Sequence, residues 1–237
     1  VWAPTSVGAN VPSPRFGPPA VWSGTEMIIW GNASTPTGGR YDPAGNTWTP
    51  TSMGGNVPTA RGNNSAVWTG AEMIVWGGNS CTPSCTLPLA GGRYNPASDS
   101  WLQTSVGANV PIGRVSHSAI WTGSEMIVWG GSVASGYTNS GGRYNPQTDA
   151  WIPTDTGINL PESRSSHTGV WIGNEMILWG GFIGTGNLDT GGRYDPTQAR
   201  WLNTHNGINV PYSTNAQHHP WGGLEMHRRV GRHEYTG

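Results

Sequence analysis

Arginine recurs in this chain at one place in a repeated segment, and in two copies histidine follows three residues later. The pattern Arg-x-x-His occurs at Arg114–His117 and at Arg164–His167. A guanidinium group donates up to five hydrogen bonds in a planar fork, and imidazole can donate, accept or bind a metal. A ring of such groups could bind an anionic or carbohydrate ligand. The candidate ring residues are Arg15, Arg61, Asn64, Arg114, His117, Arg164 and His167.

The alternative role for these arginines is structural. Because Arg stands in every full repeat, we favour a strut that donates hydrogen bonds to carbonyl groups of the neighbouring repeat. A metal site at His117 and His167 would need three or four converging ligands, and no third acid, His or Cys shares their register. No Ser–His–Asp set, acid pair or phosphate loop departs from the repeat. We therefore expect no cofactor, no metal and no catalytic residue.

The elements that must position these residues form a repeat of about 50 residues. The motif Gly-Gly-Arg-Tyr-Asp/Asn-Pro begins at Gly38, Gly91, Gly141 and Gly191. A period near 50 with strand-type units is typical of a propeller. Two further positions keep the same intervals: Trp2, Trp48, Trp101, Trp151, Trp201 and Glu26, Glu72, Glu125, Glu175, Glu225.

Each repeat predicts four short strands. In the third repeat these are "SHSAIWTG" (116–123), "EMIVWGG" (125–131), "GGRYNP" (141–146) and "DAWIPT" (149–154). The second strand is apolar on both faces, which predicts burial between stacked sheets. Pro146 cannot donate to a ladder and ends the third strand. One repeat cannot bury both faces alone, so neighbouring repeats must stack.

This pattern resembles the kelch-repeat family over essentially the whole chain. The resemblance rests on an apolar strand that ends in Gly-Gly ("MIVWGG"), then "RYNP", then "SW", then "VPIGR" (110–114). It implies an all-β fold, a β-propeller of four-stranded kelch-type blades. We expect a single domain over 1–237, with units 20–51, 66–104, 117–154, 167–204 and 215–237. The N-terminal segment 1–6 would supply the missing outer strand of the last unit and close a ring of about five blades.

The end of the chain departs from the repeat. After Glu225-Met226 the expected apolar strand is replaced by "HRRVGRHEYTG". A shift of one nucleotide could restore "IVVWGG", which favours a frameshifted blade and a longer parent of six or seven blades. Two alternatives remain open: a charged edge strand that discourages pairing between molecules, and a polybasic binding site.

Composition narrows the class of partner. Charged residues are 11% of the chain, the net charge is −1, and all twelve cationic residues are Arg. Nothing here favours nucleic acid or an anionic membrane. No apolar run reaches the length of a membrane span. Cys81 and Cys85 could form a local disulfide or remain two free thiols. The disulfide is favoured in a secreted loop, so we expect an extracellular or periplasmic, bacterial, tryptophan-rich protein.

The connections between the second and third strands differ most from repeat to repeat, so specificity is expected there. Tyr137, Phe182 and Ile183 are the binding candidates in these loops. The favoured function is a non-catalytic scaffold for a protein or carbohydrate partner. Two alternatives stay open: a carbohydrate-active enzyme, of oxidase or isomerase type, with an axial site, and a structural accessory subunit of a larger envelope complex. Matching registers of Glu and Arg also predict an ion pair within each blade.

Overall fold

The computed structural model describes residues 2–81 and 84–204, and this part of the chain consists of strands and turns without helices. Sixteen of its strands form four antiparallel sheets of four strands each. Blade 1 contains β1 (Ala20–Trp22), β2 (Met27–Trp30), β3 (Gly38–Asp42) and β4 (Thr47–Pro50). Blade 2 contains β5 (Ser65–Trp68), β6 (Met73–Trp76), β9 (Gly92–Asn95) and β10 (Ser100–Gln103). Blade 3 contains β11 (Ser118–Trp121), β12 (Met126–Trp129), β15 (Gly141–Asn145) and β16 (Ala150–Pro153). Blade 4 contains β17 (Thr168–Trp171), β18 (Met176–Trp179), β19 (Gly191–Asp195) and β20 (Arg200–Asn203).

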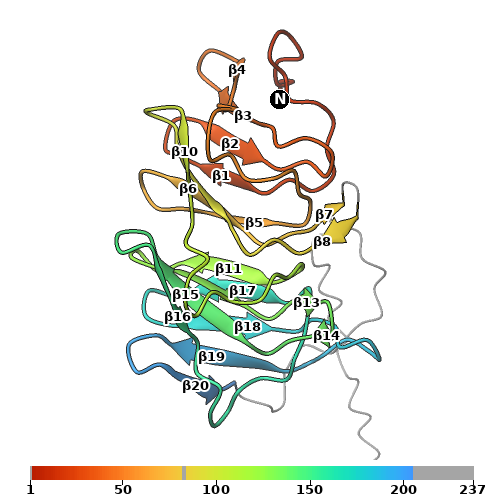
Figure 1. Ribbon diagram of the computed structural model, residues 1–237, viewed down its shortest axis with the longest axis vertical. Helices are drawn as coiled ribbons and strands as arrows, with labels where there is room; N and C mark the ends of the chain where they lie inside the picture. Colours follow the sequence, from red (N-terminus) through yellow and green to blue (C-terminus); the bar gives the residue numbers. More distant parts are fainter. Residues whose placement is uncertain (1, 82–83, 205–237) are drawn as a thin grey trace, which may run out of the picture.

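Within each blade the strands pair in chain order. The first strands of successive blades contact one another, β1 with β5, β5 with β11 and β11 with β17, so they form the inner side of the array. In Figure 1 the four sheets follow one another along the long axis of the view. Four-stranded antiparallel sheets whose first strands adjoin are the blades of a β-propeller architecture, as the repeat predicted.

Two short hairpins decorate the connections between second and third strands. They are β7 (Ser80–Cys81) with β8 (Cys85–Thr86), and β13 (Ser132–Val133) with β14 (Gly136–Tyr137). Both lie on the right in Figure 1. We call this side of the blades the loop face. The opposite strand ends, where β1–β2, β5–β6 and β9–β10 turn, form the turn face.

Stacking of the blades depends on tryptophan. Trp76 on β6 is fully buried and packs on Trp151 of the next blade, with ring centroids 5.3 Å apart. The same contact joins Trp30 to Trp101 at 5.3 Å and Trp129 to Trp201 at 5.1 Å. Large aromatic side chains bury much apolar area in a single contact. The expected burial of the second strand on both faces is confirmed, since all four residues of β6 and of β12 are buried.

In blades 1 to 3 a turn also binds the segment that precedes the blade, whereas blade 4 has Ala199 at this position and no side-chain acceptor. In blade 3, Asp149 accepts a hydrogen bond from the Tyr144 hydroxyl (2.6 Å) and one from the backbone N–H of Ser105 (2.8 Å). Ser105 directly precedes the crossing segment that leaves blade 2. In blade 1, Asn46 accepts the corresponding bond from the N–H of Ser6 (2.7 Å). The N-terminal segment therefore meets blade 1 as the end of a preceding outer strand would.

Ring closure stays a prediction. Residues 2–6 are described without a strand, and Trp2 is fully exposed. The unit expected to pair with them, 215–237, lies outside the described residues, as does the divergent tail after Met226. The first four expected units each contain one blade, although β5 begins one residue before its unit, at Ser65.

Candidate functional site

Each repeated arginine is held by carbonyl groups. Arg114 is fully buried and donates hydrogen bonds to the carbonyl oxygens of Ile112 (3.0 Å), Gly130 (3.1 Å) and Ser140 (2.6 Å). Gly130 follows β12 and Ser140 precedes β15, so the guanidinium joins the two strand ends of blade 3. Arg61 and Arg164 are buried and bind the equivalent carbonyls of their own blades. Arg15 is only half-buried and donates to the Thr37 carbonyl at 2.8 Å.

The acceptors lie in the blade that the arginine introduces. The expectation of side-chain bonds to the neighbouring blade was therefore wrong, because the side chain turns forward between the strand ends. The hydrogen bond to the preceding blade comes instead from the backbone, although the Arg114 guanidinium also lies over the Trp76 ring of blade 2, 6.0 Å from its centroid. The Arg114 carbonyl accepts from the N–H of Gly78, at 2.9 Å. Burial lowers the pKa of Arg61 and of Arg114 to about 10, so both stay cationic at neutral pH.

The two histidines join adjacent blades. His117 Nε2 lies 2.8 Å from Ser65 Oγ of blade 2, and its ring meets Trp76 edge-on at 5.4 Å. His167 repeats both contacts, with Ser118 Oγ at 3.0 Å and Trp129 at 5.3 Å. Burial, reinforced by nearby arginine charge, lowers the pKa of His117 to about 3 and that of His167 to about 4. Both imidazoles are therefore neutral at pH 7.

Blade 2 carries Asn64 at the histidine position. It is buried, 8% exposed, and its amide atoms find no hydrogen-bond partner in the described part of the chain. The Nδ1 atoms of His117 and His167 are likewise without such a partner there. The structure thus places Asn64, His117 and His167 between blades, whereas each arginine binds carbonyls of the blade that follows it. A ligand-binding role for them stays a prediction.

The loop candidates meet on the loop face. Tyr137 belongs to β14 of blade 3, and Phe182 follows β18 of blade 4. Their rings contact edge to face, with centroids 5.9 Å apart. Phe182 is 37% exposed and Tyr137 is half-buried. The position of Phe182 is fixed by its backbone, which exchanges two hydrogen bonds with Ser165, at 3.0 and 2.9 Å. Ile183, half-buried, is next in the chain.

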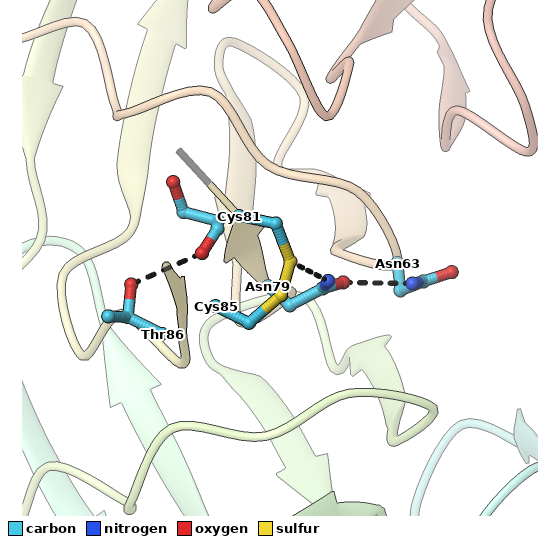
Figure 2. The surroundings of a disulfide bond; sticks show 6 residues. Asn63, Asn79, Cys81, Cys85 and Thr86 are labelled. Carbon is cyan, nitrogen blue, oxygen red and sulfur yellow. Dashed lines mark hydrogen bonds between the residues drawn. A yellow bond between two sulfur atoms is a disulfide. The ribbon is translucent and has the colours of Figure 1, made fainter. Parts of the chain in front are cut away.

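The third loop, in blade 2, is closed by a disulfide between Cys81 and Cys85 (Figure 2). The Asn79 amide lies beside it, with Nδ2 3.1 Å from Cys81 Sγ. Asn63, on the crossing segment, donates in turn to Asn79 Oδ1 at 2.9 Å. The loop is therefore tied to the crossing segment that enters its own blade.

The expected ion pairs within the blades are confirmed. Glu72 lies 2.9 Å from Arg93, Glu125 3.2 Å from Arg143 and Glu175 2.9 Å from Arg193. In blade 1 the pair is looser, with 3.9 Å between Glu26 and Arg40. Within 2–81 and 84–204, no three His, Cys, Asp or Glu side chains are grouped as a metal site would require. That same part of the chain has no helix long and apolar enough to cross a membrane.

From sequence we did not anticipate a groove on the turn face between blades 1 and 2. It has a volume of about 390 Å³. Its lining residues are Ser23, Thr25, Glu26, Trp68, Gly70, Ala71, Asn95, Pro96 and Ala97. The sequence signal that could have indicated the groove was a difference in side-chain size between repeats. Ala97 is small where Gln147 and Thr197 stand in later blades.

Comparison with known proteins decides the family. Residues 92–222 match the model of the KLHDC2/KLHL20/DRC7 kelch-repeats domain. That match spans more than half of the chain. The chain belongs to the kelch-repeat family. No curated protein sequence matches this kelch chain.

Among solved structures, the kelch chain is similar to one titled "Structure of YjhT". The sequences are 16% identical, the TM-score is 0.65, and the match covers 88% of this chain and 70% of that chain. At this identity the likeness shows the fold alone. Kelch repeats generally mediate protein interactions, as scaffolds.

Proposed function

We propose that this kelch propeller is a non-catalytic, extracytoplasmic scaffold that binds a protein partner on its loop face. The observation that carries the proposal is the contact between Tyr137 and Phe182. These aromatic residues come from adjacent blades and depart from the repeat, yet they meet at 5.9 Å with Phe182 exposed. Rigid, partly exposed aromatic residues are enriched at the centres of protein interfaces.

The arginine ring supports the scaffold over the enzyme alternative. Arg61, Arg114 and Arg164 are at most 1% exposed, and each donates to carbonyls and to one side-chain hydroxyl. A group that already has its acceptors gains little by binding an anionic substrate. Ser140 and Thr190, at the ends of the loops, accept hydrogen bonds from Arg114 and Arg164, whereas Tyr137 and Phe182 contact each other. Binding is therefore assigned to the loops, and the arginines to holding the loop ends in place.

A peptide-selection experiment tests the loop face. A random-peptide phage library is selected on the full-length protein, and enriched peptides are then measured against Tyr137→Ala and Ile152→Ala. Ile152 lies on outer strand β16 of the same blade and is 49% exposed, so its variant is a matched loss of exposed apolar area. We expect Tyr137→Ala to weaken binding at least tenfold and Ile152→Ala to leave it unchanged. Equal binding by both variants would place the interaction elsewhere.

The disulfide supports the extracytoplasmic setting. Disulfides persist in oxidising compartments and are rare where glutathione and thioredoxin keep thiols reduced. The test is to alkylate the native protein in its source cells before lysis and then to measure its intact mass. Unmodified, oxidised Cys81 and Cys85 are the expected result. Two alkylated thiols would indicate a reducing compartment and remove this part of the proposal.

A further inference from the structure

The groove between blades 1 and 2 lies away from the loop face. It is formed where the β1–β2 turn of blade 1 meets the β5–β6 and β9–β10 turns of blade 2. These turns are at the strand ends opposite to the hairpins β7–β8 and β13–β14 (Figure 1). Its volume of about 390 Å³ is within the size range of small-molecule sites. It is thus separate from the site of the proposed function.

The sequence explains why space opens at this boundary. Ala71 and Ala97 line the groove on the blade 2 side. At the same two repeat positions, blade 3 has Ser124 and Gln147, and blade 4 has Asn174 and Thr197. The positive-φ residues of these turns have nearly the same φ in blades 2, 3 and 4, for example 100° at Gly70, 104° at Gly123 and 99° at Gly173, so the smaller side chains leave room. The difference is specific to blade 2 among the second, third and fourth blades.

Trp68 supplies a fixed aromatic surface to the groove. It ends β5 and is partly buried, because it packs against the core cluster that includes Ile28, Trp30 and Met73. A ring held by such packing loses little conformational entropy when a ligand contacts it. The exposed part of the indole offers a flat apolar surface.

Polar groups face the same space. The Glu26 carboxylate has the longest ion pair of the four blades, 3.9 Å to Arg40, and so keeps acceptor capacity. Asn95 Oδ1 accepts from the N–H groups of Ala97 (2.9 Å) and Ser98 (3.3 Å), which orients the side chain. Its Nδ2 group has no acceptor among the described residues and is available as a donor. The hydroxyl of Thr25 adds a donor and acceptor at the rim.

We propose that this groove binds a neutral saccharide. A sugar ring presents an apolar C–H face that can lie on Trp68, and hydroxyl groups that can donate to Glu26 and accept from Asn95. A cationic ligand fits less well. Arg40 remains beside Glu26 and is held there, since it donates to the Pro96 carbonyl at 2.7 Å. That guanidinium offsets the carboxylate and would repel a second positive charge.

The test fills the groove with a side chain that the repeat already accepts. Ala97→Gln introduces the residue that blade 3 carries as Gln147, so the fold has a precedent for it. Full-length wild type, Ala97→Gln and the reciprocal Gln147→Ala are applied to an array of immobilised neutral glycans. Bound glycans are then titrated in solution as free oligosaccharides. A thermal melt of each variant verifies folding.

We expect wild type and Gln147→Ala to bind a shared set of neutral glycans, and Ala97→Gln to bind them at least tenfold more weakly. Glu26→Gln, which keeps the shape and removes the charge, should weaken binding severalfold. Absence of glycan binding by folded wild type would overturn the proposal. So would unchanged binding by Ala97→Gln, because the glycan would then occupy another site. Neither result affects the peptide test of the loop face, which uses different residues and a different probe.

Discussion

Arg114 and Tyr137 belong to one blade and to neighbouring connections of the loop face, yet they are used in opposite ways. Arg114 stands at a position that every described blade fills with Arg, is 0% exposed and binds three carbonyls. Tyr137 stands in a connection whose sequence differs from blade to blade, and it meets Phe182 of the next blade at a partly exposed edge.

The difference shows that repeated residues of a blade join its strand ends, whereas residues outside the repeat are available to bind a partner. Strand ends of each blade leave carbonyl groups that must be satisfied when neighbours bury them. The repeated arginine donates these hydrogen bonds and so has few N–H groups available for a ligand. The variable parts of the loops lie beyond these joined strand ends, so their side chains are available for binding. Four predictions can break or sharpen this division.

The largest expected effect is on the pH dependence of stability, and it comes from the two histidines that follow the repeated arginines. The folded pKa values of His117 and His167, about 3 and about 4, lie below the ordinary value of 6.5. Below pH 6.5 the unfolded chain therefore takes up protons that the folded chain does not. Stability from the neutral imidazoles is complete above pH 6.5 and is lost as the pH falls toward 4. Each such histidine contributes a slope of about 1.4 kcal/mol per pH unit.

Urea unfolding at pH 7, 6, 5 and 4.5 measures this slope. The double variant His117→Asn, His167→Asn uses the residue that blade 2 carries at this position, Asn64. We expect its slope to be shallower, with the remainder contributed by carboxylates. Identical slopes in wild type and variant would show that the two imidazoles are protonated in the folded protein.

The next effect tests the arginine itself. Arg114→Ala removes four hydrogen bonds, three to carbonyls and one to the Ser140 hydroxyl, and leaves the carbonyls of Gly130 and Ser140 without this donor. We expect a loss of about 3 kcal/mol in the free energy of unfolding. Arg15→Ala is the matched control, because that guanidinium is only half-buried and should cost less. Equal losses would mean that burial of the arginine does not matter.

A smaller effect on the free energy of unfolding is expected when the ion pairs within blades are broken, and it should differ between blade 2 and blade 1. Glu72→Gln breaks a pair at 2.9 Å between side chains that are 16–18% exposed, and we expect a loss of about 1 kcal/mol. Glu26→Gln should change stability by less than about 0.5 kcal/mol, because its pair is at 3.9 Å. Chemical denaturation at low and high salt compares the two. A larger loss for Glu26→Gln would contradict the proposed availability of its carboxylate.

The smallest effect on stability is expected in the loops. Phe182→Leu retains apolar volume and removes the edge-to-face contact with Tyr137, for about 0.5 kcal/mol. Binding of the peptides selected on the loop face should nevertheless fall about tenfold, since the aromatic edge is part of the binding surface. A stability loss comparable to that of Arg114→Ala would mean that Phe182 is a core residue, and the comparison would fail.

Much of the architecture could be predicted from local pattern. The spacing of Trp, of Gly-Gly-Arg-Tyr and of Glu predicted four-stranded blades, and the strands fall within one residue of the expected units. Glu72 and Arg93 could be paired from register alone, because strand alternation places them on one face. The acceptors of Arg114 could not be predicted, since a side chain at the start of a blade can turn either forward or back. Only the positions of Gly130 and Ser140 decide this.

The sequence by itself determined which residues repeat and therefore which ones join the blades. It also showed that Tyr137 and Phe182 escape the repeat, and that Ala71 and Ala97 are smaller than their counterparts in blades 3 and 4. Tertiary structure alone decided that Tyr137 meets Phe182 and that the two alanines open a groove beside Trp68 and Glu26. The physical reason is that both features form between blades. Strand period specifies each blade from within, whereas the distance between side chains of two blades depends on how their surfaces pack.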